Sequence, residues 1–298
     1  MMTTSHRMGR ILILGGNGQV GFELQRSVAP FGEVSAPRRS ELDVSDLAAV
    51  SAYLETYQPQ LILNAAAWTA VDKAEEEREG AMRLNAELPA LLAEKATELD
   101  ATLVHYSSDY VYPGDGDQPW REDSPTAPLS VYGESKLAGD EAVLASVCRH
   151  LVFRTSWVYA ARGNNFMKTM LKLGRDRDAL NIVNDQIGAP TPARLIAQLT
   201  CEALRQRIGS GLYHLAPQGT TSWHGFAQSI FRLAIAQGET LAIDPQTLGG
   251  IPTAEYPTPA TRPLNSRLAL AKLESALGLE LPDWQSQLAL TLKEHLDR

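Results

Sequence analysis

A short apolar run that ends in a glycine-rich turn constrains the fold of this chain more than any other segment. Residues 11–14 are all Ile or Leu, and glycines follow at positions 15, 16, 18 and 21. An uninterrupted apolar run is typical of a strand that is buried on both faces of a parallel sheet. The glycines allow a tight turn and a close approach of the backbone to a pyrophosphate, and the amides of a following helix would face that anion. The segment therefore predicts a dinucleotide-binding turn, with an ordinary glycine-rich turn as the alternative.

Strand-like and helix-like segments alternate after this turn. Strands are expected at 34–36, 61–63, 102–106, 151–153, 182–183 and 211–215, and helices at 18–28, 46–57, 85–100 and 132–147. Ser45 is the expected N-cap of the second helix. The alternation predicts an α/β protein with a doubly wound, Rossmann-type parallel sheet and a smaller C-terminal α/β substrate domain.

The same pattern divides the chain into two parts. Residues 1–152 are expected to form the dinucleotide-binding domain, with 1–9 as a loose tail. Residues 153–298 are expected to form mainly the substrate-binding domain, with the chain returning to the main sheet around 180–215. A proline- and glycine-rich stretch at 113–128 is expected to be a loop that borders the active site, as long loops often do.

Composition excludes several classes of protein. A net charge of −8 argues against a general nucleic-acid binder, which would carry a basic face. No apolar run approaches the roughly 18 residues that cross a membrane. Cys148 and Cys201 are too few for a disulfide framework, so we expect a cytoplasmic enzyme. No cysteine or histidine spacing indicates a zinc site.

The residues after the second expected strand bear on which dinucleotide binds. NAD enzymes usually place a carboxylate at the tip of that strand, where it bonds the ribose 2′-hydroxyl. Here Arg38 and Arg39 occupy the tip, while Glu33 falls at the opposite end of the strand. A guanidinium matches a 2′-phosphate, so the sequence favours NADPH, with NADH as a cofactor that is not excluded. The alternative is that both arginines belong to a solvated turn.

A Tyr-xxx-Lys pair begins the fourth expected helix. Tyr132 and Lys136 are four residues apart and therefore lie on one helical face. The lysine charge is expected to lower the pKa of the phenol, so that tyrosine can transfer a proton. Ser107 and Ser108, on the strand before it, offer a hydroxyl that could share the charge developing on a carbonyl oxygen. A surface helix that happens to carry a tyrosine and a lysine is the alternative.

Taken together, the chain resembles the extended short-chain dehydrogenase/reductase superfamily, and within it the dTDP-4-dehydrorhamnose reductases. The segments that carry the resemblance span the chain: 15–21, 64–75, 104–112, 130–139, 154–159, 184–191 and 262–268. The resemblance implies an oxidoreductase that uses NADPH to reduce the C4 keto group of dTDP-4-dehydro-β-L-rhamnose. The product, dTDP-L-rhamnose, is a precursor of cell-surface polysaccharide such as lipopolysaccharide O-antigen.

The resemblance also implies a role for individual residues. Tyr132 would be the proton donor, Lys136 would lower its pKa and hold the nicotinamide ribose, and Ser108 would bond the keto oxygen. Besides Tyr132 and Lys136, the cofactor would be contacted by Gly15, Asn17, Gly18, Gln19, Val20, Arg38, Asp43, Val44, Ala65, Ala66, Ala67, Trp68, Thr69 and Tyr106. The sugar nucleotide would be contacted by Thr69, Ser108, Asp109 and Trp157, although Trp157 could equally be a core aromatic.

Two positions depart from the family pattern. Ser108 stands where the family usually has threonine, and both side chains supply a hydroxyl. Some members bind Mg²⁺ through glutamates at a dimer interface, and one of those positions falls near Arg194. A guanidinium there opposes a metal ion, so we expect no metal and leave a homodimer open.

Two other functions stay open at this stage. The first is another nucleotide-sugar enzyme, either an epimerase or a dehydratase. A dehydratase needs an acid pair that Asp109 alone does not supply. The second is a non-catalytic, nucleotide-binding regulatory subunit on the same scaffold. The presence of Ser108, Tyr132 and Lys136 counts against it.

Overall fold

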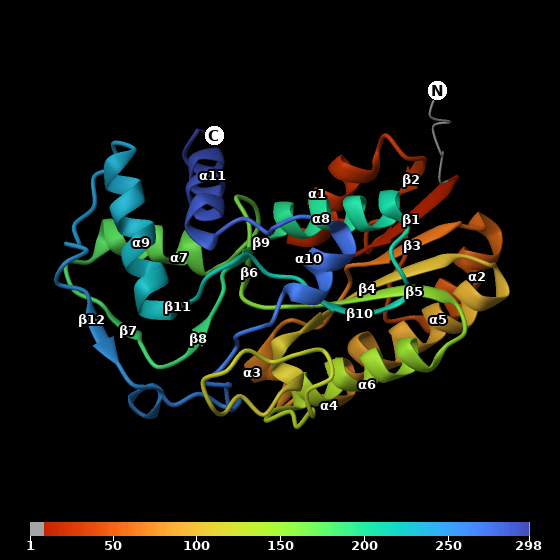
Figure 1. Ribbon diagram of the computed structural model, residues 1–298, viewed down its shortest axis with the longest axis horizontal. Coiled ribbons are helices and arrows are strands. Elements are labelled where there is room, and N and C mark those ends of the chain that lie inside the picture. The colour runs from red at the N-terminus through yellow and green to blue at the C-terminus, as the bar shows by residue number, and fades with distance from the viewer. Residues whose placement is uncertain (1–8, 298) are drawn as a thin grey trace.

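The computed structural model describes residues 9–297, and the expected tail lies almost entirely outside them. A six-stranded sheet forms the centre of the molecule, with strand order β10-β5-β4-β3-β1-β2 (Figure 1). Its strands are β1 (Arg10–Leu14), β2 (Glu33–Ser35), β3 (Leu61–Asn64), β4 (Thr102–Ser108), β5 (Arg149–Thr155) and β10 (Gly211–His214). Every neighbouring pair is parallel. The predicted doubly wound α/β fold is confirmed.

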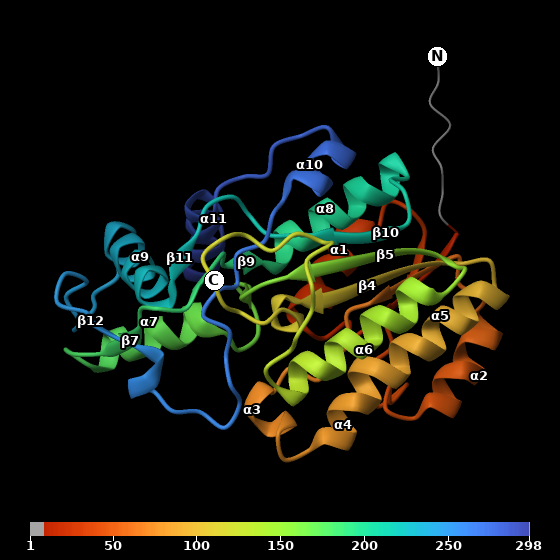
Figure 2. The same ribbon diagram turned by 60° about the horizontal axis from the view of Figure 1, so that its bottom comes forward.

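Helices cover both faces of this sheet, as Figure 2 shows. One face carries α1 (Gln19–Val28) and α8 (Ala193–Gln206), and the other carries α2 (Leu47–Tyr57), α5 (Leu88–Glu98) and α6 (Val131–Ala145). Alternate residues of β1 enter the two cores: Ile11 and Ile13 pack on the α1 side, and Leu12 and Leu14 on the α2 side. This two-sided burial explains why the sequence run is continuously apolar rather than alternating.

Two helix starts differ from the prediction. The N-cap of α2 is Asp46, whose carboxylate accepts from the amide of Ala49, whereas Ser45 bonds to Asp43. The helix expected at 85–100 is the end of a longer helical stretch. It comprises α4 (Arg78–Met82), a π-helical turn η1 (Arg83–Glu87) and α5. Single π-helical turns inside helices occur frequently at functional sites, and here the turn directs the buried Asn85 amide to Trp68 and Ser135.

A smaller lobe lies at one end of the sheet and has its own hydrophobic core (Figure 1). Its helices are α7 (Phe166–Asp176), α9 (Trp223–Ala236) and α11 (Trp284–Leu296). Three two-stranded sheets join it: β7 (Asn181–Val183) with β12 (Gly249–Ile251), β8 (Ile187–Gly188) with β11 (Thr221–Ser222), and β6 (Val158–Tyr159) with β9 (Thr191–Pro192). The strand expected at 182–183 is therefore part of this lobe and not of the main sheet. The chain returns to the main sheet through α8 and β10, and β5 extends past the expected boundary at 152.

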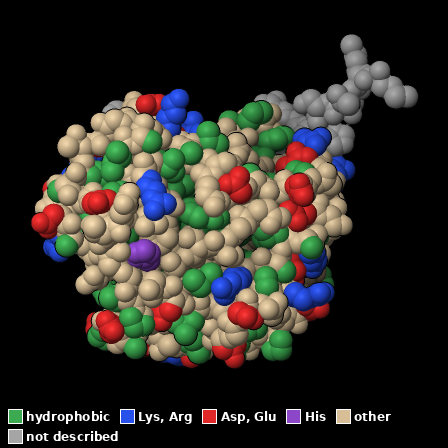
Figure 3. All heavy atoms as spheres, turned by 60° about the vertical axis from the view of Figure 1, so that its left-hand side comes forward, with side chains coloured by type: hydrophobic (Ala, Val, Ile, Leu, Met, Phe, Trp, Pro, Cys, Tyr) green, Lys and Arg blue, Asp and Glu red, His purple; other side chains and the backbone are tan. Residues whose placement is uncertain are grey.

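Short elements complete the described chain. They are α3 (Val71–Ala74), the 3₁₀ turns η2 (Asp109–Val111) and η3 (Thr253–Glu255), and α10 (Ala271–Leu277). The expected loop at 113–128 lies against the 265–268 segment through a bridge between Trp120 and Leu268. Within residues 9–297 no helix is long and apolar enough to cross a membrane. On the face in Figure 3, basic and acidic side chains are interspersed and form no broad basic patch.

The strand order fixes where a ligand can bind. The chain leaves β1 toward β2 on one side and then returns to place β3 on the other side of β1. Open α/β sheets bind ligands at such a switch point, beyond the carboxyl ends of the two strands. Those ends lead directly into the glycine turn after Leu14 and into the segment after Asn64.

Candidate active site

The glycine turn has the close backbone contacts that its sequence predicts. Gly15 adopts a φ of 77°, and a Cβ there would lie 2.6 Å from backbone atoms of Ala65 and Ala66. A Cβ on Gly21 would lie 2.2 Å from the carbonyl oxygen of Gly15. Gly18 begins α1 with no side-chain cap, which leaves the first amides of the helix available to an anion. These glycines are required by contact with the next strand and with the helix, and not only by the turn.

A cavity of about 600 Å³ opens at this turn. Its lining contains eight of the expected cofactor residues: Gly15, Asn17, Gly18, Asp43, Val44, Ala67, Trp68 and Thr69. Lys73 and Arg83 add positive charge to the same wall. A glycine cradle, free helix amides and basic side chains fit a dinucleotide, so the residues present match the expected cofactor.

The two arginines at the tip of β2 lie differently. Arg39 lines the cavity, and its guanidinium pairs with Asp43 at 3.3 Å. Arg38 is absent from the lining, and its backbone amide donates to Glu41. Hydrogen bonds from Ser45 lower the pKa of Asp43, with a smaller contribution from the charge of Arg39. The structure thus brings Arg39, rather than the expected Arg38, to the cofactor cavity.

The other expected cofactor residues take supporting positions. Ala65 and Ala66 form the backbone that Gly15 approaches, and Val20 packs on the hydrophobic core. The Gln19 side chain accepts a hydrogen bond from Asn165 of the smaller lobe at 2.8 Å. Tyr106 points away from the cavity, because its hydroxyl bonds to Thr200 on α8. Its carbonyl oxygen turns the other way and accepts from Lys136 on α6.

The N-terminal turn of α6 brings the predicted catalytic residues together. Ser130 caps this helix, so Tyr132 lies in its first turn and Lys136 one turn later. The Tyr132 ring meets Tyr110 edge to face, with centroids 5.5 Å apart. Lys136 is buried, and its amine donates to the carbonyl oxygen of Tyr106 at 2.6 Å. Ser108, at the end of β4, interacts with Tyr132 and donates to Asp109 at 3.1 Å.

Burial dominates the acidity of these groups. It raises the pKa of Tyr132 to about 12, although the hydrogen bond with Ser108 opposes the rise. It lowers the pKa of Lys136 to about 8, against the opposing charge of Asp140. The expectation that Lys136 lowers the phenol pKa is therefore wrong for this structure, because the amine is turned to a backbone carbonyl. A phenol with a raised pKa stays protonated, which is the state that a proton donor needs.

Two expected substrate residues border this centre. Asp109 is buried, one of its carboxylate oxygens has no hydrogen-bond partner among the described residues, and burial raises its pKa to about 6. Trp157 is half-buried, has a φ of 49°, and stacks on Trp223 with ring centroids 3.8 Å apart. A bulky residue in the left-handed region marks a position that its surroundings force. Trp157 is thus held by an aromatic partner that the sequence analysis did not single out.

A second cavity, of about 470 Å³, lies in the smaller lobe and was not predicted. Tyr110 and Arg262 line it beside the catalytic centre, and Trp223, Gln186 and Arg177 line it further away. Arg262 forms a two-pronged ion pair with Asp72 of α3, at 2.8 and 3.0 Å. The 262–268 segment carries part of the resemblance, but the sequence assigns no role to Arg262. Only the fold shows that this arginine, 190 residues from Asp72, meets it.

The environment of Arg194 bears on the expected absence of metal. Its guanidinium lies 2.6 Å from Glu294 and 3.8 Å from Glu23. Arg26 approaches the same two carboxylates at 3.4 and 3.5 Å. Between residues 9 and 297 no group of three or more histidine, cysteine or acidic side chains is arranged to hold a metal ion. Two guanidinium groups supply the positive charge at this position.

Comparison with known proteins agrees with this geometry. The family model described as RmlD substrate binding domain matches residues 9–296. The dTDP-4-dehydrorhamnose reductase of Escherichia coli K12 is 47% identical, over 95% of this chain and 97% of its own length. That of Salmonella typhimurium LT2 is 49% identical, over 92% and 94%. The crystal structure of the Bacillus anthracis dTDP-4-dehydrorhamnose reductase in complex with NADP has a TM-score of 0.89 and 32% identity, over 96% of this chain and 99% of that one. The predicted resemblance is confirmed, and the chain belongs to the dTDP-4-dehydrorhamnose reductase family.

Proposed function

We propose that this protein uses NADPH to reduce the C4 keto group of dTDP-4-dehydro-β-L-rhamnose, which yields dTDP-L-rhamnose. The observation that carries the proposal is that Tyr132 and Lys136 on α6 and Ser108 at the end of β4 come together, in a chain of this family whose glycine turn opens into a cavity. The reaction is the last step in making dTDP-L-rhamnose, a precursor of cell-surface polysaccharide. A dTDP-sugar with a ketone at C4 offers both a nucleotide for the second cavity and a carbonyl for the reduction.

The cofactor would lie in the first cavity. The amides at the start of α1 would bind its pyrophosphate, and Thr69 and Trp68 would line the path to the nicotinamide. Arg39 is our candidate for the 2′-phosphate, in place of Arg38. When bound, NADPH supplies the hydride that reduces C4.

The chain's own residues then handle the oxygen at C4. Ser108 turns its hydroxyl from Asp109 to the keto oxygen and shares the negative charge that develops there. Tyr132 donates its proton to that oxygen, so that the alkoxide becomes the product hydroxyl. Lys136 would remain charged beside them and would hold the nicotinamide ribose. The phenolate that is left takes a proton from solvent before the next turnover.

The substrate would extend from Tyr132 into the second cavity. Asp109 and Thr69 would contact the sugar, and Trp157 would form one wall of its site. Arg262, with Arg177 further along, provides positive charge for the diphosphate, and Trp223 provides a flat surface for the thymine ring. This placement accounts for both cavities with one ligand pair.

The two alternatives have less support. A regulatory subunit without turnover has no need of a buried lysine and a tyrosine beside a serine hydroxyl, and all three are present. A dehydratase would need a second acid beside Asp109. The matches at 47 and 49% identity are with dTDP-4-dehydrorhamnose reductases.

A direct assay tests the proposal. Purified protein is mixed with NADPH and dTDP-4-dehydro-β-L-rhamnose, and both the loss of NADPH absorbance and the mass of the sugar nucleotide are followed. We expect the sugar nucleotide to gain two hydrogens as NADPH is consumed in equal amount. If the NADPH absorbance did not fall and the mass of the sugar nucleotide did not change, this reductase activity would be excluded.

We further propose a cytoplasmic location, because Cys148 and Cys201 are both unpaired, as a reducing compartment favours.

A further inference from the structure

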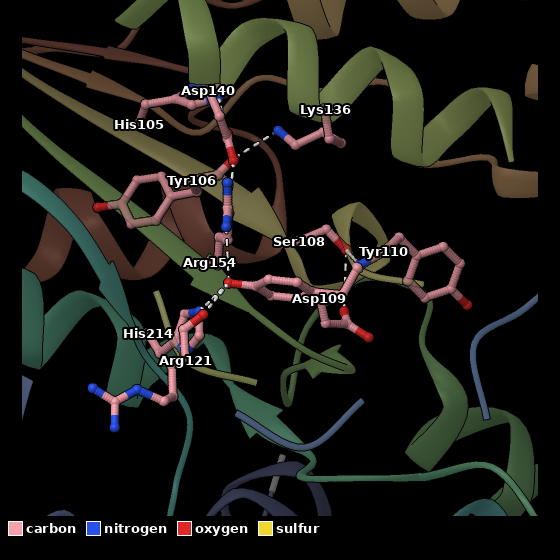
Figure 4. A network of polar contacts seen from close by, with 11 residues as sticks. His105, Tyr106, Ser108, Asp109, Tyr110, Arg121, Lys136, Asp140, Arg154 and His214 are labelled. Carbon is pink, nitrogen blue, oxygen red and sulfur yellow. Dashed lines mark hydrogen bonds and ion pairs between the residues drawn. The ribbon is translucent and has the colours of Figure 1, made fainter. Parts of the chain in front are cut away.

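Behind the catalytic lysine lies a buried charged group that the reaction above does not use. Asp140 follows Lys136 by four residues on α6, so Tyr132, Lys136 and Asp140 form one stripe along the helix. Asp140 is fully buried, and Lys136 is 2% exposed. Figure 4 shows Lys136 and Asp140 side by side on the helix, with Arg154 reaching toward Asp140 from the sheet. A carboxylate buried this deeply is costly unless it is paired and hydrogen-bonded.

Arg154 fixes one oxygen of Asp140. Its Nε donates to Asp140 Oδ2 at 2.9 Å, and its Nη1 donates to the hydroxyl of Tyr112 at 2.8 Å. That hydroxyl also bonds His214 Nε2 at 2.7 Å, while His214 Nδ1 faces the carbonyl oxygen of Ala269. His214 donates through Nδ1, because a carbonyl oxygen can only accept, and its Nε2 and the carbonyl oxygen of Arg121 are the two acceptors within reach of the single proton of Tyr112. Burial lowers the pKa of His214 to about 3, and the ring is neutral.

The other oxygen of Asp140 faces His105. Oδ1 lies 3.8 Å from His105 Nε2, and neither atom has a hydrogen-bond partner in the described part of the chain. Burial and the charge of Lys136 lower the pKa of His105 well below its usual range, so this ring adds no charge. Burial raises the pKa of Asp140 above its usual range, while the charge of Arg154, together with Ser107 and Lys136, opposes that rise and favours the ionised form.

Three elements contribute charged or titratable groups around Lys136. Helix α6 contributes Asp140 and the neutral Tyr132, β4 contributes the neutral His105, and β5 contributes Arg154. Asp140 is thus the single anion among these groups, beside two buried cations. If Asp140 were neutral, Lys136 and Arg154 would both be uncompensated in the interior, a strongly unfavourable arrangement.

We propose that Asp140, held in place by Arg154, is a positioning residue that keeps Lys136 protonated for the reduction. The pair acts through the lysine and does not touch the substrate or the cofactor. Burial alone would drive the lysine to release its proton, and Asp140 opposes that tendency. Arg154 on β5 in turn fixes the position of this carboxylate through its hydrogen bond to Oδ2. The inference rests on the proposed function, in which Lys136 acts as a cation.

The pH dependence of the reaction tests this proposal. The protonated form of Lys136 is the active one, so kcat is full below its pKa and falls as pH rises through it. Asp140→Asn keeps the shape of the side chain but removes its charge. We expect the alkaline limb of the kcat profile to move down by about one pH unit or more, the usual effect of losing a nearby opposite charge. Glu141→Gln is the matched control, because it removes the same charge from the next residue, on the exposed side of α6.

Further readouts separate positioning from a structural role. NADPH affinity, followed by fluorescence without the sugar, should weaken at a lower pH in Asp140→Asn than in the wild type. In a Lys136→Met background, Asp140→Asn should cost no further activity, since it acts through the lysine. Failure of the wild type to turn over would count against the proposed reaction, but the NADPH binding profile would still test the role of Asp140.

The proposal is overturned if Asp140→Asn is slower or less stable while both pH profiles coincide with those of the wild type. If Asp140→Asn does not fold, the double variant Asp140→Asn/Arg154→Met takes its place, because it removes both charges of the buried pair. Its alkaline limb should also lie below that of the wild type, by less than in the single variant. A limb unchanged in the double variant would equally overturn the role of Asp140.

Discussion

Tyr132 is kept protonated by its surroundings rather than activated by its lysine. The amine of Lys136 donates to a backbone carbonyl, and burial raises the pKa of Tyr132 to about 12. For a reductase this arrangement is suitable, because the phenol must still hold its proton when the hydride has been transferred. The driving force for proton transfer comes from the alkoxide, which is a much stronger base than a phenolate.

Replacing Tyr132 by phenylalanine tests its role as the acid. The ring of the variant can keep its edge-to-face contact with Tyr110, so we expect an unchanged melting temperature and unchanged NADPH binding. We expect kcat to fall by about 10² to 10⁴, the usual contribution of a general acid. Steady-state kinetics would reveal the effect, and a variant that turns over at nearly the normal rate would show that another group supplies the proton.

The arginines after β2 offer a matched pair of variants for cofactor choice. Arg39 lines the cofactor cavity and Arg38 does not, although they are adjacent in the chain. A charge-assisted contact with a phosphate is worth about 1.5–3 kcal/mol, which corresponds to roughly tenfold or more in affinity. Arg39→Gln should therefore raise the KM for NADPH at least tenfold and leave that for NADH almost unchanged.

Arg38→Gln is the control for that experiment. It removes the same charge from the adjacent residue, and we expect less than a threefold change in the KM for NADPH or for NADH. Equal effects of Arg39→Gln on both cofactors would mean that this arginine does not recognise the 2′-phosphate. A large NADPH-specific effect of Arg38→Gln would show that Arg38, as the sequence predicts, recognises the 2′-phosphate.

At the scale of elements, the sequence predicts the parts of the fold that depend on local pattern. The continuous apolar runs of β1 and β3 are buried on both faces, so each could be recognised alone. The turn after β1 could be recognised because close backbone contacts at Gly15 and Gly21 exclude any side chain. Contacts between distant segments have no such local pattern. Trp223 beneath Trp157 and Arg262 on Asp72 became visible only in the folded chain.

The link between α3 and the 260–262 segment makes a testable prediction of its own. Asp72 on α3 accepts from both arms of Arg262 and from the amide of Ala260. It therefore ties Arg262, which lines the second cavity, to the helix whose Lys73 lines the first. Asp72→Asn should loosen this wall of the second cavity. A partly exposed pair of this kind is worth about 1 kcal/mol, so we expect a roughly fivefold higher KM for the sugar nucleotide and little change in kcat.

An exposed ion pair elsewhere provides the comparison. Arg121 and Asp123 are paired on the surface at 3.2 Å, and Asp123→Asn should change neither KM nor kcat. Initial rates at varied sugar nucleotide, with NADPH saturating, measure both variants. An unchanged KM in Asp72→Asn would mean that the wall keeps its shape without the ion pair.

At the scale of the whole molecule, the two lobes meet at the cofactor turn as well as at the substrate. Asn165 of the smaller lobe bonds Gln19 at the start of α1, and the Arg162 guanidinium lies 3.8 Å from the centre of the Phe22 ring. On the same side, α11 of the smaller lobe reaches α1 and α8 through Glu294. Charged contacts therefore cross the boundary between the lobes. The sequence could not place this boundary to the residue, because β5 runs past residue 152 and β10, from the later half of the chain, pairs with β5 in the main sheet.

These charged contacts lead to the last prediction, which concerns metal and assembly. Two guanidinium groups, of Arg194 and Arg26, face the carboxylates of Glu23 and Glu294 from α8 and α1. A divalent ion needs oxygen ligands that are not already held by cations, and a guanidinium offers none. The proposed chemistry also requires no metal, since Ser108 and Tyr132 deal with the oxygen. We expect full activity in EDTA and the same mass by light scattering with and without Mg²⁺. Arg194→Ala would remove one cation from this cluster and is the variant in which any response to Mg²⁺ should first emerge. If EDTA slowed the wild type and Mg²⁺ restored it, the ion would have to bind through carboxylates outside this cluster or displace both arginines from it.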